Sequence, residues 1–336
     1  MQTLVALLIA VLLVAGTVPA GAAEKITLLQ GFHSMSFTPL YVAKAKKLFE
    51  AEGLDVDVQI VSGSSIAFRG AVAGQGQFAA MGATELITAA EKGLDRMVAI
   101  AAINRAVTVS FAMRKDVAEA KGLKPGAPIK DRVAALKGLR IATGSPGGAI
   151  HTVVTYMLKQ GGIDPKNEVT LLSMSGTAPM LAALRAKQID AIAISPPAPE
   201  TAAAEGLGVL VIALARGDMP EMGTIAYDAL VTSKEYAEKN PDVVRKVVRA
   251  IGQASNFVTD HPAETREIML RAFDKTPPDV MAAVVDNLKG AFARDARFSE
   301  EMWKNAINFN VEAGKIGKRL ETREGVLWTN QYNAGR

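Results

Sequence analysis

Loops that combine glycine with serine or threonine stand just before several expected helices, and they could bind an anion. Glycine lets a ligand approach the backbone closely, and the free N–H groups at a helix start attract negative charge. The loops that follow an expected strand span residues 32–37, 62–65, 82–85, 144–148, 175–177 and 195–197, and four of them (62–65, 82–85, 144–148 and 175–177) contain glycine. Two or three such helix starts around one cleft could hold a sulfonate, a carboxylate or a phosphate without an arginine.

Helix capping is the alternative interpretation of each of these loops. For any single loop we favour capping, whereas the shared position of the whole set at strand ends favours a binding edge. The loop at 144–148 is the strongest candidate, because its consecutive glycines, Gly147 and Gly148, exceed what a cap requires. The sequence therefore predicts ligand contacts from His33, Ser34, Met35, Phe37, Ser64, Ser65, Thr84, Glu85, Ser145, Gly147, Gly148, Thr177, Ser195 and Tyr227.

Some of these candidates have a structural alternative that stays open. His33 could donate to an anion or be a partly exposed polar residue. Glu85 could pair with a cationic ligand group, but we favour the interpretation in which it only complements the positive end of its own helix. Phe32, Phe37 and Tyr227 could cover an apolar ligand, and we expect core packing for at least one of them.

Catalytic and cofactor motifs are missing from the chain. It contains no cysteine, which excludes disulfides, thiolate catalysis, cysteine-ligated zinc and lipid attachment through a cysteine. It also has no GxxxxGK[ST] loop, HExxH motif or GxSxG elbow. Residues 74–79 fit G-x-G-x-x-A, but they precede an expected strand, whereas the dinucleotide fingerprint follows one. We therefore expect a protein that is not an enzyme and uses no metal and no cofactor.

The composition favours a folded protein that does not bind nucleic acid. The chain has 336 residues, 49% hydrophobic and 21% charged, which excludes global disorder. Aromatic residues make up only 5%, which argues against a base-stacking platform. The net charge of +4 is spread along the chain without a long run of like charges.

The first 23 residues have the pattern of a secretory signal peptide. An apolar run at 4–18 is followed by Pro19 and by small residues at 20–23, although no lysine or arginine precedes the run. A membrane anchor is the alternative, but the run is shorter than the roughly 20 residues that a spanning helix needs. We expect cleavage after Ala22 or Ala23 and a periplasmic protein without a lipid anchor.

The order of expected elements indicates an internal duplication. Strands and helices alternate as βαβαβ over 26–92, and the same order returns over 138–195. Ser62 and Gly63 correspond to Ser175 and Gly176 at an offset of 113 residues. Such alternation predicts parallel sheets with helices on their faces, and ligands bind at the carboxyl ends of such strands.

The duplication predicts two α/β lobes that face each other across a cleft. Strand-like segments at 107–113 and 225–232 are expected to cross between the lobes and to serve as the hinge. The first lobe would comprise residues 24–112 and 225–336, and the second 113–224. The helices beyond residue 233, among them an amphipathic one at 241–259, are expected to pack on the first lobe.

At this level the chain resembles the periplasmic substrate-binding proteins of ABC importers, in the nitrate, sulfonate, taurine and thiamine-precursor branch of the type II fold. The resemblance covers nearly all of the mature chain and is carried by residues 37–44, 48–56, 62–64, 139–142, 182–194 and 240–244. It implies capture of a small molecule between closing lobes and its delivery to a membrane permease, so that contact with the membrane complex is peripheral.

The sequence thus predicts a solute-binding protein for a small, anionic organic molecule such as a sulfonate or carboxylate. Two other functions stay open. One is a pyrimidine-precursor protein or enzyme related to thiamine synthesis, although the cysteine-rich iron motif of that enzyme family is absent. The other is a periplasmic sensor subunit that presents its lobes to a membrane kinase.

Overall fold

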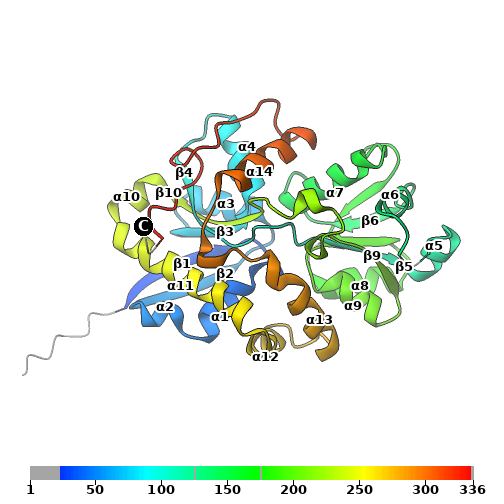
Figure 1. Ribbon diagram of the computed structural model, residues 1–336, viewed down its shortest axis with the longest axis horizontal. Helices are drawn as coiled ribbons and strands as arrows, with labels where there is room; N and C mark the ends of the chain where they lie inside the picture. Colours follow the sequence, from blue (N-terminus) through cyan, green and yellow to red (C-terminus); the bar gives the residue numbers. More distant parts are fainter. Residues whose placement is uncertain (1–22, 125, 175, 334–336) are drawn as a thin grey trace, which may run out of the picture.

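A computed structural model describes residues 23–124, 126–174 and 176–333 of the chain. Nearly all of the expected signal peptide, residues 1–22, lies outside the described residues, as does Ser175 of the loop at 175–177. Figure 1 shows two α/β lobes side by side, joined by extended segments and flanked by the C-terminal helices.

The first sheet has the strand order β2-β1-β3-β10-β4. Strands β1 (Glu24–Gln30), β2 (Leu54–Ile60) and β3 (Phe78–Gly82) are parallel, whereas β10 (Asp228–Ser233) runs antiparallel between β3 and β4 (Met97–Ala102). The carboxyl ends of the parallel strands therefore meet at one edge of this sheet.

The second sheet repeats this topology in the order β7-β6-β8-β5-β9. Strands β6 (Arg140–Thr143), β7 (Thr170–Ser173) and β8 (Ala191–Ile194) are parallel, and β5 (Ser110–Arg114) runs antiparallel between β8 and β9 (Gly208–Ala213). The two sheets confirm the expected fold class of two βαβ-type lobes joined by crossing strands.

Each lobe receives one antiparallel strand from a segment that has crossed from the other. The outward segment enters the second sheet as β5, which begins at Ser110, so the expected boundary after residue 112 falls inside this strand. The return segment enters the first sheet as β10, beginning at Asp228. The crossing residues are thus 103–109 and 214–227, and both run past the site described below.

Helices cover both faces of each sheet. In the first lobe these are η1 (Met35–Phe37), α1 (Thr38–Ala45), α2 (Leu48–Ala51), α3 (Ser64–Val72) and α4 (Ala83–Glu91). In the second lobe they are α5 (Lys115–Ala120), α6 (Ile129–Ala134), α7 (Ala149–Gln160), α8 (Thr177–Arg185) and α9 (Ala198–Ala204). The return segment itself contains the short helices η2 (Leu214–Arg216) and η3 (Pro220–Met222).

One helix expected from the sequence is in fact two. The apolar spacing over 38–51 predicts a continuous helix, but α1 ends at Ala45 and α2 begins at Leu48. Lys47 between them has a left-handed backbone, with φ of 55°. A non-glycine residue seldom adopts this conformation, and a lysine at position 47 does not indicate it.

The C-terminal helices comprise α10 (Lys234–Lys239), α11 (Pro241–Asp260), α12 (Pro262–Ala272), α13 (Pro278–Leu288), η4 (Lys289–Ala291), η5 (Arg294–Ala296) and α14 (Glu300–Glu312). The apolar face of α11, which includes Val244, Val247 and Ile251, is buried against α1, α2 and β4 of the first lobe. However, α13 also contacts α9, and α14 contacts both α4 and α7. The expectation that all these helices pack on the first lobe alone is therefore incomplete, because two of them bridge the lobes.

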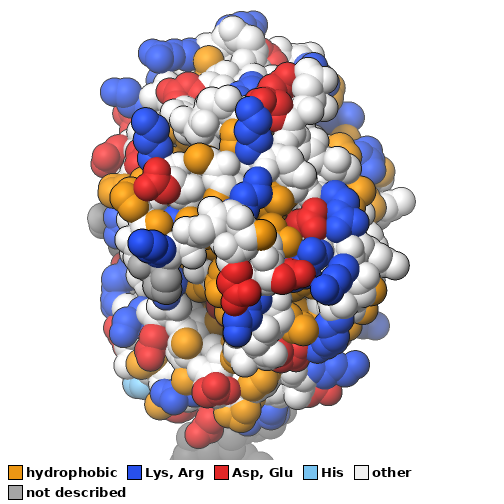
Figure 2. Space-filling model, turned by 90° about the vertical axis from the view of Figure 1, so that its right-hand side faces the viewer, with side chains coloured by type: hydrophobic (Ala, Val, Ile, Leu, Met, Phe, Trp, Pro, Cys, Tyr) orange, Lys and Arg blue, Asp and Glu red, His pale blue; other side chains and the backbone are white. Residues whose placement is uncertain are grey.

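The outer face of the second lobe carries charges of both signs. Figure 2 shows lysine and arginine side chains interspersed with aspartate and glutamate on this face. The ion pairs of the second lobe include Lys137–Glu168 and Arg140–Asp190. Within the described residues, no helix is both long and apolar enough to cross a bilayer.

The lobes touch where β3 ends and α7 begins. A Cβ atom on Gly82 would lie 2.5 Å from the Cβ of Ala149 in the other lobe and 3.0 Å from Oε2 of Glu85. The distance to Ala149 is shorter than real contacts of this kind, and the distance to Glu85 is tight, so this close approach of the lobes requires glycine at position 82.

We therefore expect Gly82→Ala to hold the lobes apart while each lobe keeps its fold. Because the chain has no cysteine, spin labels can be placed through Leu94→Cys and Val209→Cys, two exposed positions on different lobes. Double electron–electron resonance should show a longer distance between the two spin labels in the Gly82→Ala protein than in the protein with glycine at position 82. Gly290→Ala is the control, since a Cβ there has open space, and it should leave the separation unchanged. Equal separations in both variants would contradict the prediction.

Candidate functional site

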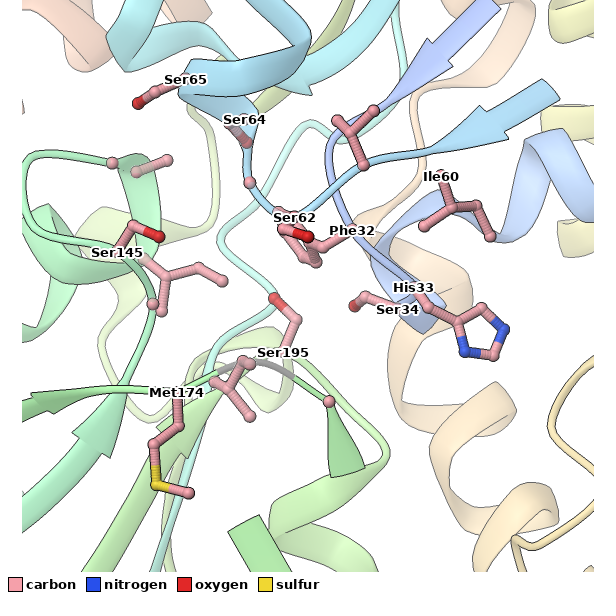
Figure 3. A pocket seen from close by; sticks show the side chains of 18 of the residues that line it. Phe32, His33, Ser34, Ile60, Ser62, Ser64, Ser65, Ser145, Met174 and Ser195 are labelled. Atoms are coloured by element: carbon pink, nitrogen blue, oxygen red, sulfur yellow. The ribbon is translucent and has the colours of Figure 1, made fainter. Parts of the chain in front are cut away.

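A cavity of about 260 Å³ lies between the lobes, at the carboxyl ends of the parallel strands of both sheets. Figure 3 shows serine side chains that converge on it from opposite walls. The first lobe contributes Phe32, His33, Ser34, Ile60, Val61, Ser62, Gly63, Ser64, Ser65 and Glu85. The second contributes Gly144, Ser145, Gly148, Ala149, Ile150, Met174, Gly176, Thr177, Ile194, Ser195, Pro197 and Ala198.

Three helices of eight or more residues begin at this cavity with a glycine at the N-cap. They are α3 after Gly63, α7 after Gly148 and α8 after Gly176, and no side chain caps any of them in the described part of the chain. By contrast, Ser233 caps α10 and Ser299 caps α14 away from the cavity. The first N–H groups of α3, α7 and α8 therefore have no capping side chain among the described residues and can bind water or a ligand. The capping interpretation does not apply to the loops at 62–65 and 144–148, whereas Ser175 of the third loop lies outside the described residues.

The duplicated serine–glycine pair has a conformational reason. Gly63 has φ of 148° and Gly176 has φ of 88°, both in the region that favours glycine. Each glycine turns the chain from the end of an outer strand, β2 or β7, into a helix that starts at the cavity. The repeat found in the sequence thus places one helix start on each wall.

Most of the residues predicted to contact a ligand lie together in the cavity wall. They are His33, Ser34, Ser64, Ser65, Glu85, Ser145, Gly148, Thr177 and Ser195. Five others do not line it: Met35, Phe37, Thr84 and Tyr227 are buried in the packing around it, and Gly147 faces a neighbouring surface groove beside Lys315.

Sequence reasoning missed the apolar part of the wall. Ile60 and Ile194 are the last residues of β2 and β8, and Val61 and Met174 directly follow β2 and β7. The position of each at a strand end was a usable indication, but their residue types pointed to ordinary core packing. Together with Phe32 and Ile150 they add apolar surface to both walls of the cavity.

The ring of His33 is turned away from the serines (Figure 3). It stacks on Phe273 with the ring centroids 4.1 Å apart and meets Tyr41 edge to face. Burial lowers the pKa of His33 below its ordinary value, so that the ring is neutral at pH 7. The part of His33 that lines the cavity therefore carries no charge.

Glu85 is the one carboxylic acid in the cavity wall, and the described lining contains no lysine or arginine. Its side chain is buried, Ser65 donates to Oε1 at 3.4 Å, and Oε2 has no hydrogen-bond partner among the described residues. Burial, reinforced by the nearby charge of Asp228 and opposed by Lys315, raises the pKa of Glu85 to about 8. The wall is thus neutral at pH 7, apart from the partial charges of the helix starts.

A chain of buried hydrogen bonds connects the cavity to both crossing segments. The Ser195 hydroxyl lies 2.8 Å from Thr108 Oγ1, and Thr108 donates to Ser36 Oγ at 3.0 Å. Ser36 in turn donates to Asp228, and Asn104 Nδ2 donates to Asp228 Oδ2 at 2.6 Å. Thr108 and Asn104 belong to the outward segment and Asp228 ends the return segment, so the network fixes the position of Ser195.

No group of three or more histidine, cysteine, aspartate or glutamate side chains suited to a metal ion occurs among residues 23–124, 126–174 and 176–333. The donors at the cavity are instead hydroxyl and backbone N–H groups, which suit oxygen atoms of an anion or of a polar neutral molecule.

These features define a two-lobed protein of the periplasmic-binding-protein fold, with an interlobe cavity. Comparison with known proteins gives its family: residues 21–272 match the NMT1-like family, and the chain belongs to it. A relative from Bacillus subtilis, named as the binding protein YtlA, is 24% identical over 300 residues, which cover 88% of this chain and 85% of the relative. The family-level resemblance predicted from the sequence is confirmed.

Solved structures share the fold at low sequence identity. The alkanesulfonate-binding protein SsuA of Xanthomonas axonopodis, bound to MOPS, is 20% identical with a TM-score of 0.63, covering 79% of this chain and 85% of that one. The nitrate-binding protein NrtA of Synechocystis is 18% identical with a TM-score of 0.67, covering 89% and 84%. The desulfurization enzyme DszB is 13% identical with a TM-score of 0.59, covering 93% and 96%.

Asp228 should make the stability of the protein depend on pH. Burial raises its pKa to about 7 from an ordinary value of 3.8, although Ser36 and Asn104 donate to it. The folded state therefore holds the proton of Asp228 more tightly than the unfolded state does. The stability that this proton contributes to the folded protein is complete below pH 3.8 and is lost as the pH rises to about 7. The slope is at most about 1.4 kcal/mol per pH unit.

Asp228→Asn removes this proton and should reduce the slope by that amount between pH 4 and 7 (roughly the interval between the ordinary and the shifted pKa). Urea unfolding of both proteins at several pH values measures it, and the difference between them isolates Asp228 from the other buried acids. Parallel stability curves for the two proteins would show that Asp228 is ionised in the folded state at all these pH values.

Proposed function

We propose that this protein is the extracytoplasmic solute-binding component of an ABC importer, which captures a small organic anion between its lobes and delivers it to a permease. The observation that carries the proposal is the convergence on one cavity of three helix starts, from both lobes, that no side chain of the described residues caps. Such starts bind anions through N–H groups and the helix dipole.

The position of the cavity couples binding to closure. Helix α3 belongs to the first lobe and α7 and α8 to the second, so a ligand that contacts all three starts bridges the lobes. It therefore has a higher affinity for the closed arrangement than for the open one, which is the requirement for a ligand-driven change of population. A permease that contacts both lobes could distinguish the two arrangements.

The size and polarity of the cavity favour a compact ligand with an apolar part. Its volume of about 260 Å³ lies just below the roughly 300–1,000 Å³ of ordinary small-molecule sites. The hydroxyl groups and helix starts would hold an acidic group, while Phe32, Ile150 and Met174 offer apolar contact. A small sulfonate or carboxylate fits this division.

The related proteins support the same class of ligand. The structural neighbours include an alkanesulfonate-binding protein bound to MOPS, which carries a sulfonate group, and a nitrate-binding protein. A relative from Brachyspira hyodysenteriae, 26% identical over 231 residues, is named as an ABC transporter periplasmic binding protein. The signal-peptide pattern of residues 1–23 supports a periplasmic location.

An enzyme is the second candidate function, because the structural neighbours include a desulfurization enzyme. The cavity gives it little support. Among the described lining residues, only His33 and Glu85 are titratable near neutral pH, and the ring of His33 stacks on Phe273 instead of facing a serine. A nucleophile paired with a histidine or lysine base is thus not formed in the described wall.

Thermal unfolding against a panel of sulfonates, carboxylates, nitrate and pyrimidines tests the proposal. A ligand at 100 times its Kd should stabilise the protein by about 2.7 kcal/mol. Ser145→Ala and Thr177→Ala each remove a hydroxyl from the wall and should weaken binding of an anion about tenfold or more, because hydrogen bonds to charged groups contribute about 1.5–3 kcal/mol.

Ser299→Ala is the matched control. Ser299 caps α14 and lies outside the cavity wall, so its loss should lower stability by about 1 kcal/mol and leave the ligand affinity unchanged. If no compound of the panel stabilises the protein while one of them is chemically converted by it, the protein is an enzyme and the proposal is wrong.

A further inference from the structure

The carboxyl group of Glu85 lies where three helix starts from the two lobes come together. Glu85 is in the first turn of α4, and Ser65 in the first turn of α3 donates to its Oε1 at 3.4 Å. Across the cleft, a Cβ on Gly148, the N-cap of α7, would lie 3.4 Å from the same oxygen. Opening of the lobes would separate Glu85 from Gly148 and return the carboxyl group to water.

The charged and titratable groups around Glu85 come from three other elements. Asp228 of β10 repels a negative charge on Glu85, Lys315 after α14 attracts it, and the Tyr227 hydroxyl is buried nearby. Lys315 is itself half-buried, which lowers its pKa. Neither Lys315 nor any other cation donates a hydrogen bond to Glu85 in the described structure, and Oε2 has no partner there.

The requirement for anion binding conflicts with an ionised Glu85. A carboxylate in contact with the acidic group of a ligand inside a closed cavity would repel it strongly, because the local dielectric constant is low. A neutral carboxyl group instead adds an O–H donor to the hydroxyl and N–H donors already present. The burial of Glu85 and its unpartnered oxygen are consistent with this neutral form.

We propose that Glu85 determines the specificity of the site: its neutral carboxyl group donates a hydrogen bond to an anionic oxygen of the ligand, and closing of the lobes on the anion takes up one proton. The proposal rests on the proposed function and names the charge class of the ligand at the same site. A ligand with a cationic group would require the opposite arrangement, with an ionised Glu85 and no proton uptake.

The sign of the pH dependence follows from the two states of Glu85. We expect the carboxyl group to be exposed to water in the open protein, where its pKa would be near the ordinary 4.5, whereas in the closed arrangement burial raises the pKa to about 8. Between these values closing binds a proton, so the affinity for an anion should fall by up to about tenfold for each unit of rising pH. Above pH 8 the dependence should end.

Isothermal titration with methanesulfonate, acetate and nitrate tests the proposal. Titrations should run from pH 5.5 to 7.5 (about the interval in which Glu85 is ionised only in the open state). Bis-Tris and imidazole are suitable buffers because they carry no sulfonate group, and their different ionisation enthalpies report the number of protons taken up. The wild-type protein should bind at least one of these anions with proton uptake and with affinity that falls as the pH rises.

Three variants complete the experiment. Glu85→Gln is a permanently neutral donor, so its affinity should be independent of pH and should exceed that of the wild type by about tenfold at pH 5.5 and by more at pH 7.5. Glu85→Ala lacks the donor and should bind at least about tenfold more weakly than Glu85→Gln at every pH. Glu200→Gln is the control, because burial also raises the pKa of Glu200, to about 7, yet this residue is outside the cavity wall. It should keep the pH dependence of binding.

The outcomes are distinct. Binding of an anion with pH-independent affinity, proton release on binding, or loss of binding in Glu85→Gln would each overturn the role of Glu85 and leave the proposed function standing. If none of the three anions binds to the wild type or to Glu85→Gln at any pH, the capture of a small anion fails, and the role of Glu85 fails with it. Circular dichroism of each variant confirms that it is folded.

Discussion

The unpaired N–H groups at the starts of α3, α7 and α8 impose the constraint on which the site depends. Backbone donors at a helix start need a partner, and glycine at each N-cap position supplies no side chain for this purpose. The partner must come from the cavity. Because the starts belong to different lobes, one molecule that satisfies all of them also holds the lobes together, so recognition and closure have the same physical cause.

Two buried acids keep this constraint compatible with a neutral cavity wall. Glu85 in the wall and Asp228 behind it both have raised pKa values because burial disfavours their charged forms. In the absence of lysine or arginine in the described lining, the donors of the wall are backbone and hydroxyl groups whose positions are fixed by the fold. The hydrogen bonds from Asp228 through Ser36 and Thr108 to Ser195 connect these fixed donors to the crossing segments.

Much of the fold was predictable, and the failures have local reasons. The parallel strands and the helices between them follow from alternating apolar patterns and from glycines that end helices. Strands β4 and β9 were not predicted, because a short apolar run cannot be distinguished from a buried helix segment by its periodicity alone. The division between α1 and α2 depends on the left-handed backbone of Lys47, which local sequence does not encode. The contacts of α13 and α14 with the second lobe are long-range and have no sequence pattern.

The sequence by itself determined the duplicated α/β topology and the loops that form the cavity, because strand ends, glycines and helix starts are local features with recognisable residue types. Only the tertiary structure decided which of the loop residues face the cavity. Met35 and Phe37 are in the same loop as Ser34 but do not line the cavity, and the ring of His33 stacks on Phe273, which is 240 residues away in the chain. The state of Glu85 was decided in the same way, since its pKa depends on burial and on Asp228, which the folding of distant segments brings near.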